Sequence, residues 1–398
     1  MLSVNQIRSA PNRGRYLFHN PVLHGFMRTV DSALEVFHKP SREPLRLTPR
    51  KILVCCQAHI GDTILATSVI PVLKAAFPKS QVGFLIHPGS ADVLAGNPRV
   101  DWVHTFEHWR LNRRSLPLWR KLALDLQSRF LAIREIRRIG YDLAIDLYPY
   151  FPNSIPLLFC AGIPVRLGWT SAGFGGLLTH GMDWEDSAAH VVEWHKRLLG
   201  ILTSCREHLG LARTELYSSD DIRSQWRTIA EKYRIPDKFI AFHVGAGGIH
   251  RRWPTENWKR LAELCLDKGL SVVLLGHGEE ERAICREIAE QSPDIHDLSG
   301  QLPWRLMSEA ISQSQLLVGL ESASGHIAAA RNIPVVSIYS GTTRTSVWRP
   351  FHPSARVVVS SVPCSPCYLP GGCEGMECLR STNPETVYKE IDSSLSIA

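Results

Sequence analysis

The stretch Ile52-Leu-Val-Cys-Cys-Gln-Ala-His-Ile-Gly61-Asp62-Thr63 decides the fold of this chain. Its first residues are apolar, which is typical of a strand buried on both faces of a parallel sheet. A glycine, an acidic residue and a long helical pattern follow, so the chain turns tightly from strand into helix. The stretch therefore predicts an α/β domain whose first turn presents Asp62 at the carboxyl edge of a sheet.

A related pattern opens the second half of the chain. The apolar strand Phe239–Val244 runs into Gly245-Ala-Gly-Gly248, and His250-Arg-Arg-Trp-Pro254 follows. A further strand, 316–318, opens onto Glu321-Ser-Ala-Ser-Gly325-His326 and a helix. The acidic loop with Asp62 in the first half thus corresponds to two basic or glycine-rich loops in the second half. This layout favours an enzyme that holds a sugar nucleotide in one half and an acceptor in the other.

Length and composition are those of an ordinary globular protein of two or three domains, with 398 residues, 44% of them hydrophobic and 21% charged. No apolar run reaches the roughly 18–20 residues of a membrane-spanning helix, and no secretory signal is recognisable at the N-terminus. We therefore expect a cytoplasmic protein. The formal charge of +7 is too weak to indicate nucleic-acid binding.

The positive charge is concentrated in residues 110–138, which contain nine arginines and lysines and only Asp125 and Glu135 as acids. This segment is either a solvated helix face or a surface for an anionic acceptor or membrane. On the second interpretation Arg113 and Arg120 bind the acceptor. An amphipathic helix predicted after Asn20-Pro21 packs on the first domain or lies on a membrane surface.

Strand and helix patterns alternate from residue 50 onward, which predicts mostly parallel sheets with helices on both faces. The predicted domains are an N-terminal extension, an acceptor-binding domain and a nucleotide-sugar-binding domain, at 1–49, 50–235 and 236–398. Two Rossmann-like domains facing a central cleft are typical of the GT-B architecture. The predicted strands are 51–56, 81–86, 100–105, 141–147, 239–244, 271–275, 316–318 and 335–338. The predicted helices are 62–76, 115–139, 218–233, 256–268, 279–291, 304–312 and 325–331.

Asp62 lies where a helix begins, and two roles fit it. It either caps the helix and interacts with its dipole, or acts as a general base at the edge of a cleft. In the second case its neighbours His59, Gly61 and Thr63 contact the acceptor.

The loops of the second half carry the features of a phosphate site. Small residues after a strand let backbone N–H groups approach a phosphate, and arginines supply charge for a departing diphosphate. His326 is either a phosphate donor or a structural histidine, Trp253 packs the turn, and Glu279 either complements its helix dipole or binds ribose hydroxyls. The predicted donor-binding residues are Gly245, Ala246, Gly247, Gly248, Arg251, Arg252, Glu279, Glu321, Ser322, Ala323, Ser324, Gly325 and His326.

Four of the ten cysteines, Cys364, Cys367, Cys373 and Cys378, cluster near the C-terminus. Disulfides are disfavoured in the cytoplasm, whereas four thiolates can hold a tetrahedral Zn or Fe ion. The spacing departs from the common zinc-ribbon pattern. A metal at this segment would be structural, because the segment lies outside the glycine and aspartate loops.

Taken together, these motifs resemble glycosyltransferase family 9, the ADP-heptose:lipopolysaccharide heptosyltransferases. The resemblance covers about residues 50–395 and is carried by Ile52–Pro71, His243–Trp258, Glu321–Pro334 and the closing segment with the four cysteines and Asn383-Pro-Glu. It implies a GT-B fold, inverting transfer of a heptose from ADP-heptose, and the lipopolysaccharide inner core or a related glycan as acceptor.

The resemblance also implies residue roles, with Asp62 as the base and Arg251 on the donor diphosphate. It implies peripheral association with the cytoplasmic face of the inner membrane, where a lipid-linked anionic acceptor resides. No cofactor is expected for catalysis, since no Asp-x-Asp motif is present. Two departures are a long N-terminal extension and Ala323 where the family usually has glycine. A GT-B enzyme for another nucleotide sugar and a non-catalytic nucleotide-sugar-binding protein remain as alternatives.

Overall fold

The computed structural model describes residue 16 and residues 21–112, 114–150, 154–185, 188–248, 251–369 and 372–396. The chain forms two compact units, of which the first ends at Thr214 and the second begins at Glu215. The division predicted from the sequence falls after residue 235. The difference is helix α8 (Asp220–Lys232), which packs on helix α11 (Trp304–Gln313) of the second unit and brings Trp226 within 6.2 Å of the Phe239 ring, centroid to centroid.

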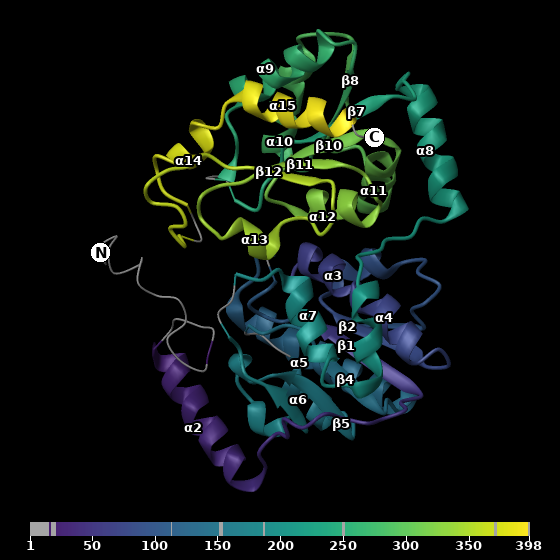
Figure 1. Cartoon of the computed structure of the whole chain (residues 1–398), viewed down its shortest axis with the longest axis vertical. Coiled ribbons are helices and arrows are strands. Elements are labelled where there is room, and N and C mark those ends of the chain that lie inside the picture. The colour runs from purple at the N-terminus through teal and green to yellow at the C-terminus, as the bar shows by residue number, and fades with distance from the viewer. Residues whose placement is uncertain are drawn as a thin grey trace. The chain divides into compact units, whose positions relative to one another are not determined.

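The N-terminal unit is built on a six-stranded sheet in the order β3-β2-β1-β4-β5-β6, in which all neighbouring strands are parallel (Figure 1). This is the doubly wound order of the Rossmann fold. The strands are β1 (Lys51–Cys56), β2 (Gln81–Ile86), β3 (Trp102–Thr105), β4 (Leu143–Asp146), β5 (Val165–Trp169) and β6 (His180–Met182).

Helices cover this sheet. The α-helices are α2 (Pro21–Phe37), α3 (Ile60–Ala66), α4 (Val69–Ala76), α5 (Leu118–Ile139), α6 (Ile155–Cys160) and α7 (Val191–Leu199). The 3-10 helices are η1 (Pro88–Leu94), η2 (Thr170–Ala172), η3 (Gly175–Leu177) and η4 (Thr203–Leu211). α5 and α6 pack on one face, where Ala132, Ile136 and Leu158 meet Leu53 and Cys55 of β1 in one buried cluster. α4, α7 and η4 pack on one another.

The helix predicted over 62–76 is two helices, α3 and α4, that meet at Thr67 and Ser68. The break has a local cause in Pro71, because proline lacks the N–H that would bond to the carbonyl of Thr67 and its ring crowds that carbonyl. That carbonyl accepts instead from the N–H of Ile70, at 3.0 Å.

The N-terminal helix α2 packs on the first unit, which is one of the two placements predicted from the sequence. A Cβ on Gly176 of η3 would lie 2.6 Å from the Cβ of Leu34.

The C-terminal unit repeats the topology, in the order β12-β11-β10-β7-β8-β9, again with parallel neighbours. Its strands are β7 (Phe239–His243), β8 (Ser271–Leu275), β9 (Ile295–Asp297), β10 (Leu316–Leu320), β11 (Val335–Ile338) and β12 (Ala355–Val358). Its other helices are α9 (Thr255–Leu266), α10 (Glu279–Ala289), α12 (Ala323–Ala330), α13 (Thr345–Trp348), α14 (Glu377–Arg380) and α15 (Pro384–Leu395).

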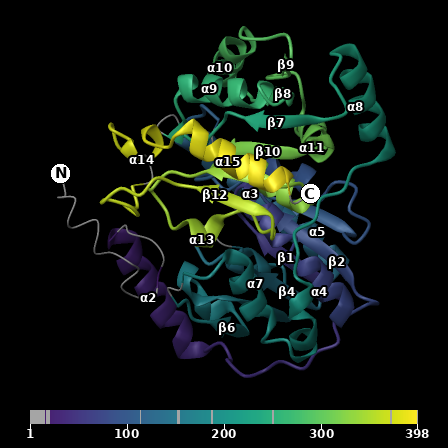
Figure 2. The same ribbon diagram turned by 45° about the horizontal axis from the view of Figure 1, so that its top comes forward.

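The final helix α15 lies beside α9, as Figure 2 shows, and both bury apolar side chains against β7 and β10. Phe242 and Trp258 are at the centre of this core, with ring centroids 5.4 Å apart. α12 packs with α11. The predicted doubly wound parallel sheets are therefore confirmed. In the described part of the chain no helix is both long enough and apolar enough to cross a bilayer.

Candidate active site

In each unit the strand order reverses between two neighbouring strands, and this switch point leaves a crevice at the carboxyl edge of the sheet. In the N-terminal unit the two strands are β1 and β4, which pair in parallel from Ile52 with Leu143 to Cys55 with Asp146. The loops that follow β1 and β4 therefore emerge side by side. The first leads into α3, which carries Asp62, and the second follows Asp146, the last residue of β4, and carries Tyr148.

Asp62 lies in the first turn of α3, where its Oδ2 accepts a hydrogen bond of 3.0 Å from the N–H of His59. The carboxylate thus caps the helix, as one of its two predicted roles requires. Burial nevertheless raises the pKa of Asp62 to about 6, because desolvation outweighs the bonds from backbone N–H groups. A carboxylate with this pKa is ionised at neutral pH and is a better proton acceptor than an ordinary aspartate.

The other residues predicted beside Asp62 have mainly local contacts. Gly61 lies within the first turn of α3. Thr63 is buried, and its hydroxyl donates back to the carbonyl of His59 at 3.2 Å. Arg120 is exposed on α5, with its guanidinium 5.1 Å from the centroid of the Trp119 ring. Arg113 lies outside the described residues. Their predicted contacts with an acceptor remain predictions.

The end of β4 and the loop that follows it were not predicted from the sequence as part of the candidate site. Asp146 is 1% exposed and accepts from the N–H groups of Ser154, at 2.8 Å, and Tyr148, at 3.3 Å. Burial raises the pKa of Asp146 to about 7. Burial, and then the neighbouring charges of Asp62 and Cys56, raise the pKa of the half-buried Tyr148, which keeps its phenol protonated beside Asp62. Aromatic residues directly after a buried strand were the available sequence signal.

In the C-terminal unit the switch point lies between β7 and β10, and an ion pair connects the segments that follow these two strands. Arg251, after β7, has its Nη1 3.8 Å from Oε1 of Glu321, the residue that follows β10. The carboxylate of Glu321 also accepts from the hydroxyls of Thr343, at 3.0 Å, and Ser340, at 3.3 Å. Burial raises the pKa of Glu321, although the charge of Arg251 opposes this. The arginine is thus held at the sheet edge and is one-fifth exposed.

The first turn of α10 holds three successive glutamates with different neighbours. Glu279 is exposed and pairs with Arg282 at 2.8 Å, whereas Glu280 pairs with Arg252 at 2.5 Å. Glu281 faces the glycine loop, since a Cβ on Gly245 would lie 2.4 Å from its carboxylate oxygens. Glu281, which the sequence analysis passed over, therefore lies against the predicted phosphate loop. Of the two arginines, Arg252 is engaged with a surface glutamate.

The start of α12 supplies backbone donors at the same edge. Ser322 is the N-cap residue, and its hydroxyl lies 2.8 Å from that of Ser324. Gly325 is needed for packing, because a Cβ there would lie 3.0 Å from Cγ of Pro350 and 3.1 Å from Oγ of Ser337. His326 is 9% exposed. Ala246 packs against the core, while a Cβ on Gly247 or Gly248 would meet no atom within 4 Å.

Trp253 has the structural role that the sequence analysis expected. It is 1% exposed, and its indole N–H donates to the carbonyl of Thr382 at 3.0 Å. Its ring meets that of Trp258 edge-on, with centroids 5.1 Å apart. This packing fixes the end of the loop that carries Arg251.

The four C-terminal cysteines lie on the segment that packs against the loop after β11. The N–H of Cys367 donates to the carbonyl of Gly341 at 3.1 Å, and a Cβ on Gly341 would lie 3.2 Å from that of Cys378. Cys364 and Cys367 are half-buried, Cys373 is exposed and Cys378 is buried. Within the described ranges, which include all four thiols, no three His, Cys, Asp or Glu side chains are grouped as metal ligands. The metal hypothesis is not confirmed.

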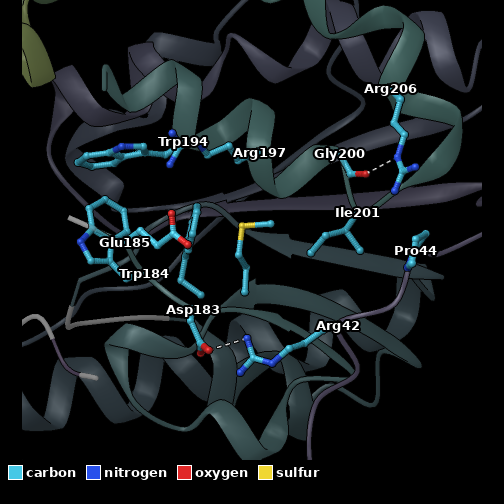
Figure 3. A pocket seen from close by; sticks show the side chains of 12 residues that line it. Arg42, Pro44, Asp183, Trp184, Glu185, Trp194, Arg197, Gly200, Ile201 and Arg206 are labelled. Carbon is cyan, nitrogen blue, oxygen red and sulfur yellow. Dashed lines mark hydrogen bonds and ion pairs between the residues drawn. The ribbon is translucent and has the colours of Figure 1, made fainter. Parts of the chain in front are cut away.

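A separate cavity of about 480 Å³ lies within the N-terminal unit, after β5 and β6 (Figure 3). Three tryptophans line it, and Trp184 packs edge-on against both Trp169 and Trp194, with centroids 5.4 and 3.9 Å apart. Arg42 and Asp183 form an ion pair of 2.6 Å beside them. These side chains contact one another, and β5 and β6 lie away from the switch point. We therefore do not include this cavity in the candidate active site.

The fold and its two switch-point sites define a class of protein. Two Rossmann-like units, one with a carboxylate of raised pKa and one with an arginine beside glycine-rich and helix-N-terminal amides, are those of a GT-B glycosyltransferase. The chain belongs to glycosyltransferase family 9 (heptosyltransferase), whose sequence model matches residues 129–371.

Individual relatives agree with this assignment. The chain is 26% identical over 305 residues to lipopolysaccharide heptosyltransferase 3 of Escherichia coli K12, covering 73% of this chain and 82% of that protein. It is 27% identical over 321 residues to lipooligosaccharide heptosyltransferase 2 of Haemophilus ducreyi, covering 77% and 88%. The structure of E. coli ADP-heptose lps heptosyltransferase II aligns with a TM-score of 0.68 at 23% identity, covering 87% of this chain and 99% of that one.

Proposed function

We propose that this protein transfers a heptose from ADP-heptose to the inner core of lipopolysaccharide or a related glycan, with inversion at the anomeric carbon. The observation that carries the proposal is Asp62, a carboxylate with a pKa of about 6 at the switch point of the N-terminal sheet. The names of the relatives support the donor and the acceptor class. The N-terminal unit would bind the acceptor and the C-terminal unit the donor.

Asp62 acts as the general base in this proposal. The oxygen of the acceptor hydroxyl attacks the anomeric carbon, the bond from that carbon to the diphosphate oxygen breaks, and the bonding electrons leave with ADP. The hydroxyl proton passes to the carboxylate of Asp62. Tyr148 lies close enough to Asp62 for the charge of that carboxylate to raise its pKa, so its phenol stays protonated and is a candidate donor to the acceptor.

Arg251 stabilises the leaving diphosphate. In the structure its charge is shared with Glu321 at 3.8 Å, and a diphosphate, with more negative charge, competes for the same guanidinium. Backbone N–H groups from Ser322 to Gly325 add donors at the start of α12. Glu281, which lies against Gly245, replaces Glu279 as our candidate for the ribose hydroxyls. Arg252 contributes less, because it is paired with Glu280.

Charge from these side chains makes a catalytic metal or organic cofactor unnecessary in this proposal. The Zn or Fe proposed for the four C-terminal cysteines would act only on structure, by fixing the segment that supports Ser340 and Thr343 beside Glu321. Elemental analysis of the purified full-length protein tests it. About one equivalent of metal supports the site, and a metal-free, fully active protein rules it out.

A donor screen tests the proposed reaction. The full-length protein is incubated with ADP-heptose, ADP-, UDP- and GDP-hexoses and a deacylated inner-core acceptor, and products are identified by mass spectrometry and their anomeric configuration by NMR. We expect transfer from ADP-heptose with inversion. Transfer only from a UDP- or GDP-sugar would replace the donor assignment. Binding of ADP without transfer from any donor would favour the non-catalytic alternative.

We also propose that the protein acts at the cytoplasmic face of the inner membrane, because the acceptor would be linked to lipid there. No nucleic-acid partner is expected.

A further inference from the structure

Helix α5 exposes a continuous apolar ridge to solvent. Trp119, Leu126 and Phe130 are 65%, 69% and 66% exposed, and Leu122 between them is 39% exposed. Their spacing of three, four and four residues places them on one face of the helix. Exposed apolar side chains are common singly, but a contiguous set of large ones marks an interaction surface.

A second, buried face of α5 fixes which way this ridge points. Ala132 and Ile136 are buried in the core beneath the sheet, and the buried carboxylate of Asp125 pairs with Nε of Arg129 at 2.7 Å. The helix therefore cannot rotate to bury the ridge without opening the core. The outward orientation is a property of the folded unit.

The ridge is bordered by positive charge. Arg120, Arg134, Arg137 and Arg138 are all exposed, and Arg137 continues the line of the ridge, since it follows Phe130 by seven residues. The only exposed acid of α5, Glu135, lies on the other side, beside His104 at 3.1 Å. The outer half of the helix thus combines large apolar side chains with arginines and contains no acid.

We propose that the α5 ridge, defined by Trp119, Leu122, Leu126 and Phe130, docks the N-terminal unit onto an anionic lipid bilayer. The apolar side chains enter the boundary between headgroups and acyl chains, and the arginines contact lipid phosphates. Tryptophan favours this interfacial depth, and long arginine side chains reach from it to the headgroups.

Charge complementarity selects the bilayer over a second copy of this chain. Two ridges meeting around a two-fold axis would bring like-charged arginines of both copies together, which is unfavourable. An anionic surface instead neutralises them. The N-terminal amphipathic helix is a weaker candidate, because α2 uses Met27 and Leu34 to pack on the unit itself.

Only the reason for docking, which is to bring the enzyme to its acceptor, rests on the proposed function. α5 follows β3, and the N–H of Glu107, just after β3, donates to the hydroxyl of Ser128 in the middle of α5 at 2.9 Å. The first half of α5 therefore extends beyond the sheet edge that also carries the loop of Asp62. Docking through the ridge would hold the acceptor-binding edge near a lipid-linked substrate. The membrane contact itself requires no transfer reaction.

Vesicle sedimentation of the full-length protein tests the docking surface. The probes are phosphatidylcholine vesicles with and without phosphatidylglycerol, at low and high salt. We expect binding to the anionic vesicles, and a loss of about tenfold or more in partitioning for Leu126→Glu with Phe130→Glu. Arg134→Gln with Arg138→Gln should weaken binding mainly at low salt, where charge is least screened.

The matched control is Leu211→Glu with Val359→Glu, which adds the same charge at exposed apolar positions away from α5. It should bind like the wild type, and circular dichroism should show all variants folded. Equal binding by the ridge variant and the control, or loss of binding only on substitution of Val36 and Phe37 in α2, would overturn the proposal. So would a wild-type dimer that the ridge variant converts to monomer.

A second readout separates this inference from the proposed function. The ridge variant should keep wild-type turnover on a deacylated, water-soluble acceptor and lose turnover on acceptor embedded in vesicles. If no donor gives transfer, the proposed function fails while the sedimentation result still stands. If the ridge variant loses turnover equally on both acceptors, the ridge does not act through the membrane.

Discussion

The two switch points share one topology and carry different charged groups. The N-terminal unit has Asp62 in the helix after β1 and Asp146 at the end of β4, and burial raises their pKa values to about 6 and about 7. In the C-terminal unit the loops after β7 and β10 present Arg251 and Glu321, 3.8 Å apart. The sheet order therefore fixes where these residues meet, and in the proposed mechanism their side chains decide whether the point accepts a proton or holds an anion.

The largest expected effect is that of Asp62→Asn on turnover. Removal of a general base typically costs about 10²–10⁴ in rate, and asparagine keeps the volume and one acceptor oxygen that can cap α3. The measurement is kcat with saturating ADP-heptose and soluble acceptor. Near wild-type turnover would mean that Asp62 only caps the helix and that the N-terminal switch point does not supply the general base.

Arg251→Ala should lower kcat/KM by about 10²–10³, the usual loss when one group that stabilises developing charge is removed. The substitution also leaves Glu321 beside the diphosphate without its partner. Glu321→Gln in the Arg251→Ala background should therefore restore part of the loss. Steady-state kinetics of the two single variants and the double variant measure this coupling. Additive effects would mean that the ion pair does not control the site.

The pH dependence of transfer sharpens the contrast between the units. The base is active when deprotonated, so kcat/KM should fall about tenfold per pH unit below the pKa of Asp62, about 6, and level off above it. Asp62→Asn should abolish this acidic limb, whereas Arg251→Ala should lower the whole profile and keep it. A limb that survives in Asp62→Asn would point to another group, and Asp146 is the next carboxylate at that edge.

The smallest expected effect is that of Arg252→Ala. Arg252 is paired with Glu280 on α10, so its charge is already neutralised at the surface. We expect kcat/KM to change by less than about threefold, in the range of exposed ion pairs. A loss as large as that of Arg251→Ala would show that Arg252 leaves Glu280 when the donor binds.

The sequence predicted the sheets well where strands are long and apolar. β1, β2, β8 and β11 have the predicted bounds, because their runs of branched and apolar residues end at polar or glycine-rich turns. β5, β6, β9 and β12 were not predicted. β6 is the three residues His180-Gly-Met and β9 is Ile295-His-Asp, and such short strands gain their structure from pairing with a neighbour and carry no periodic signal.

The site was predictable where a residue follows a strand that the sequence reveals. The sequence indicated Asp62, Arg251 and Glu321 in this way, and their roles stay predictions. Asp146 and Tyr148 were missed because their significance comes from the pairing of β4 with β1, a long-range contact. The sequence also could not show that Glu281, and not Glu279, faces Gly245. Successive residues of one helical turn point in different directions, so the exact start of α10 decides which glutamate faces that glycine.

The central claim is that the acidic switch point acts on the acceptor proton and the basic one on the donor diphosphate. Calorimetric titration of ADP into the full-length wild type, Asp62→Asn and Arg251→Ala tests it most directly. The account predicts that Asp62→Asn binds ADP within about twofold of wild type and that Arg251→Ala binds about 10–100-fold more weakly, as expected for loss of a charged hydrogen bond. Weakening of both variants to the same degree, or of Asp62→Asn alone, would contradict it.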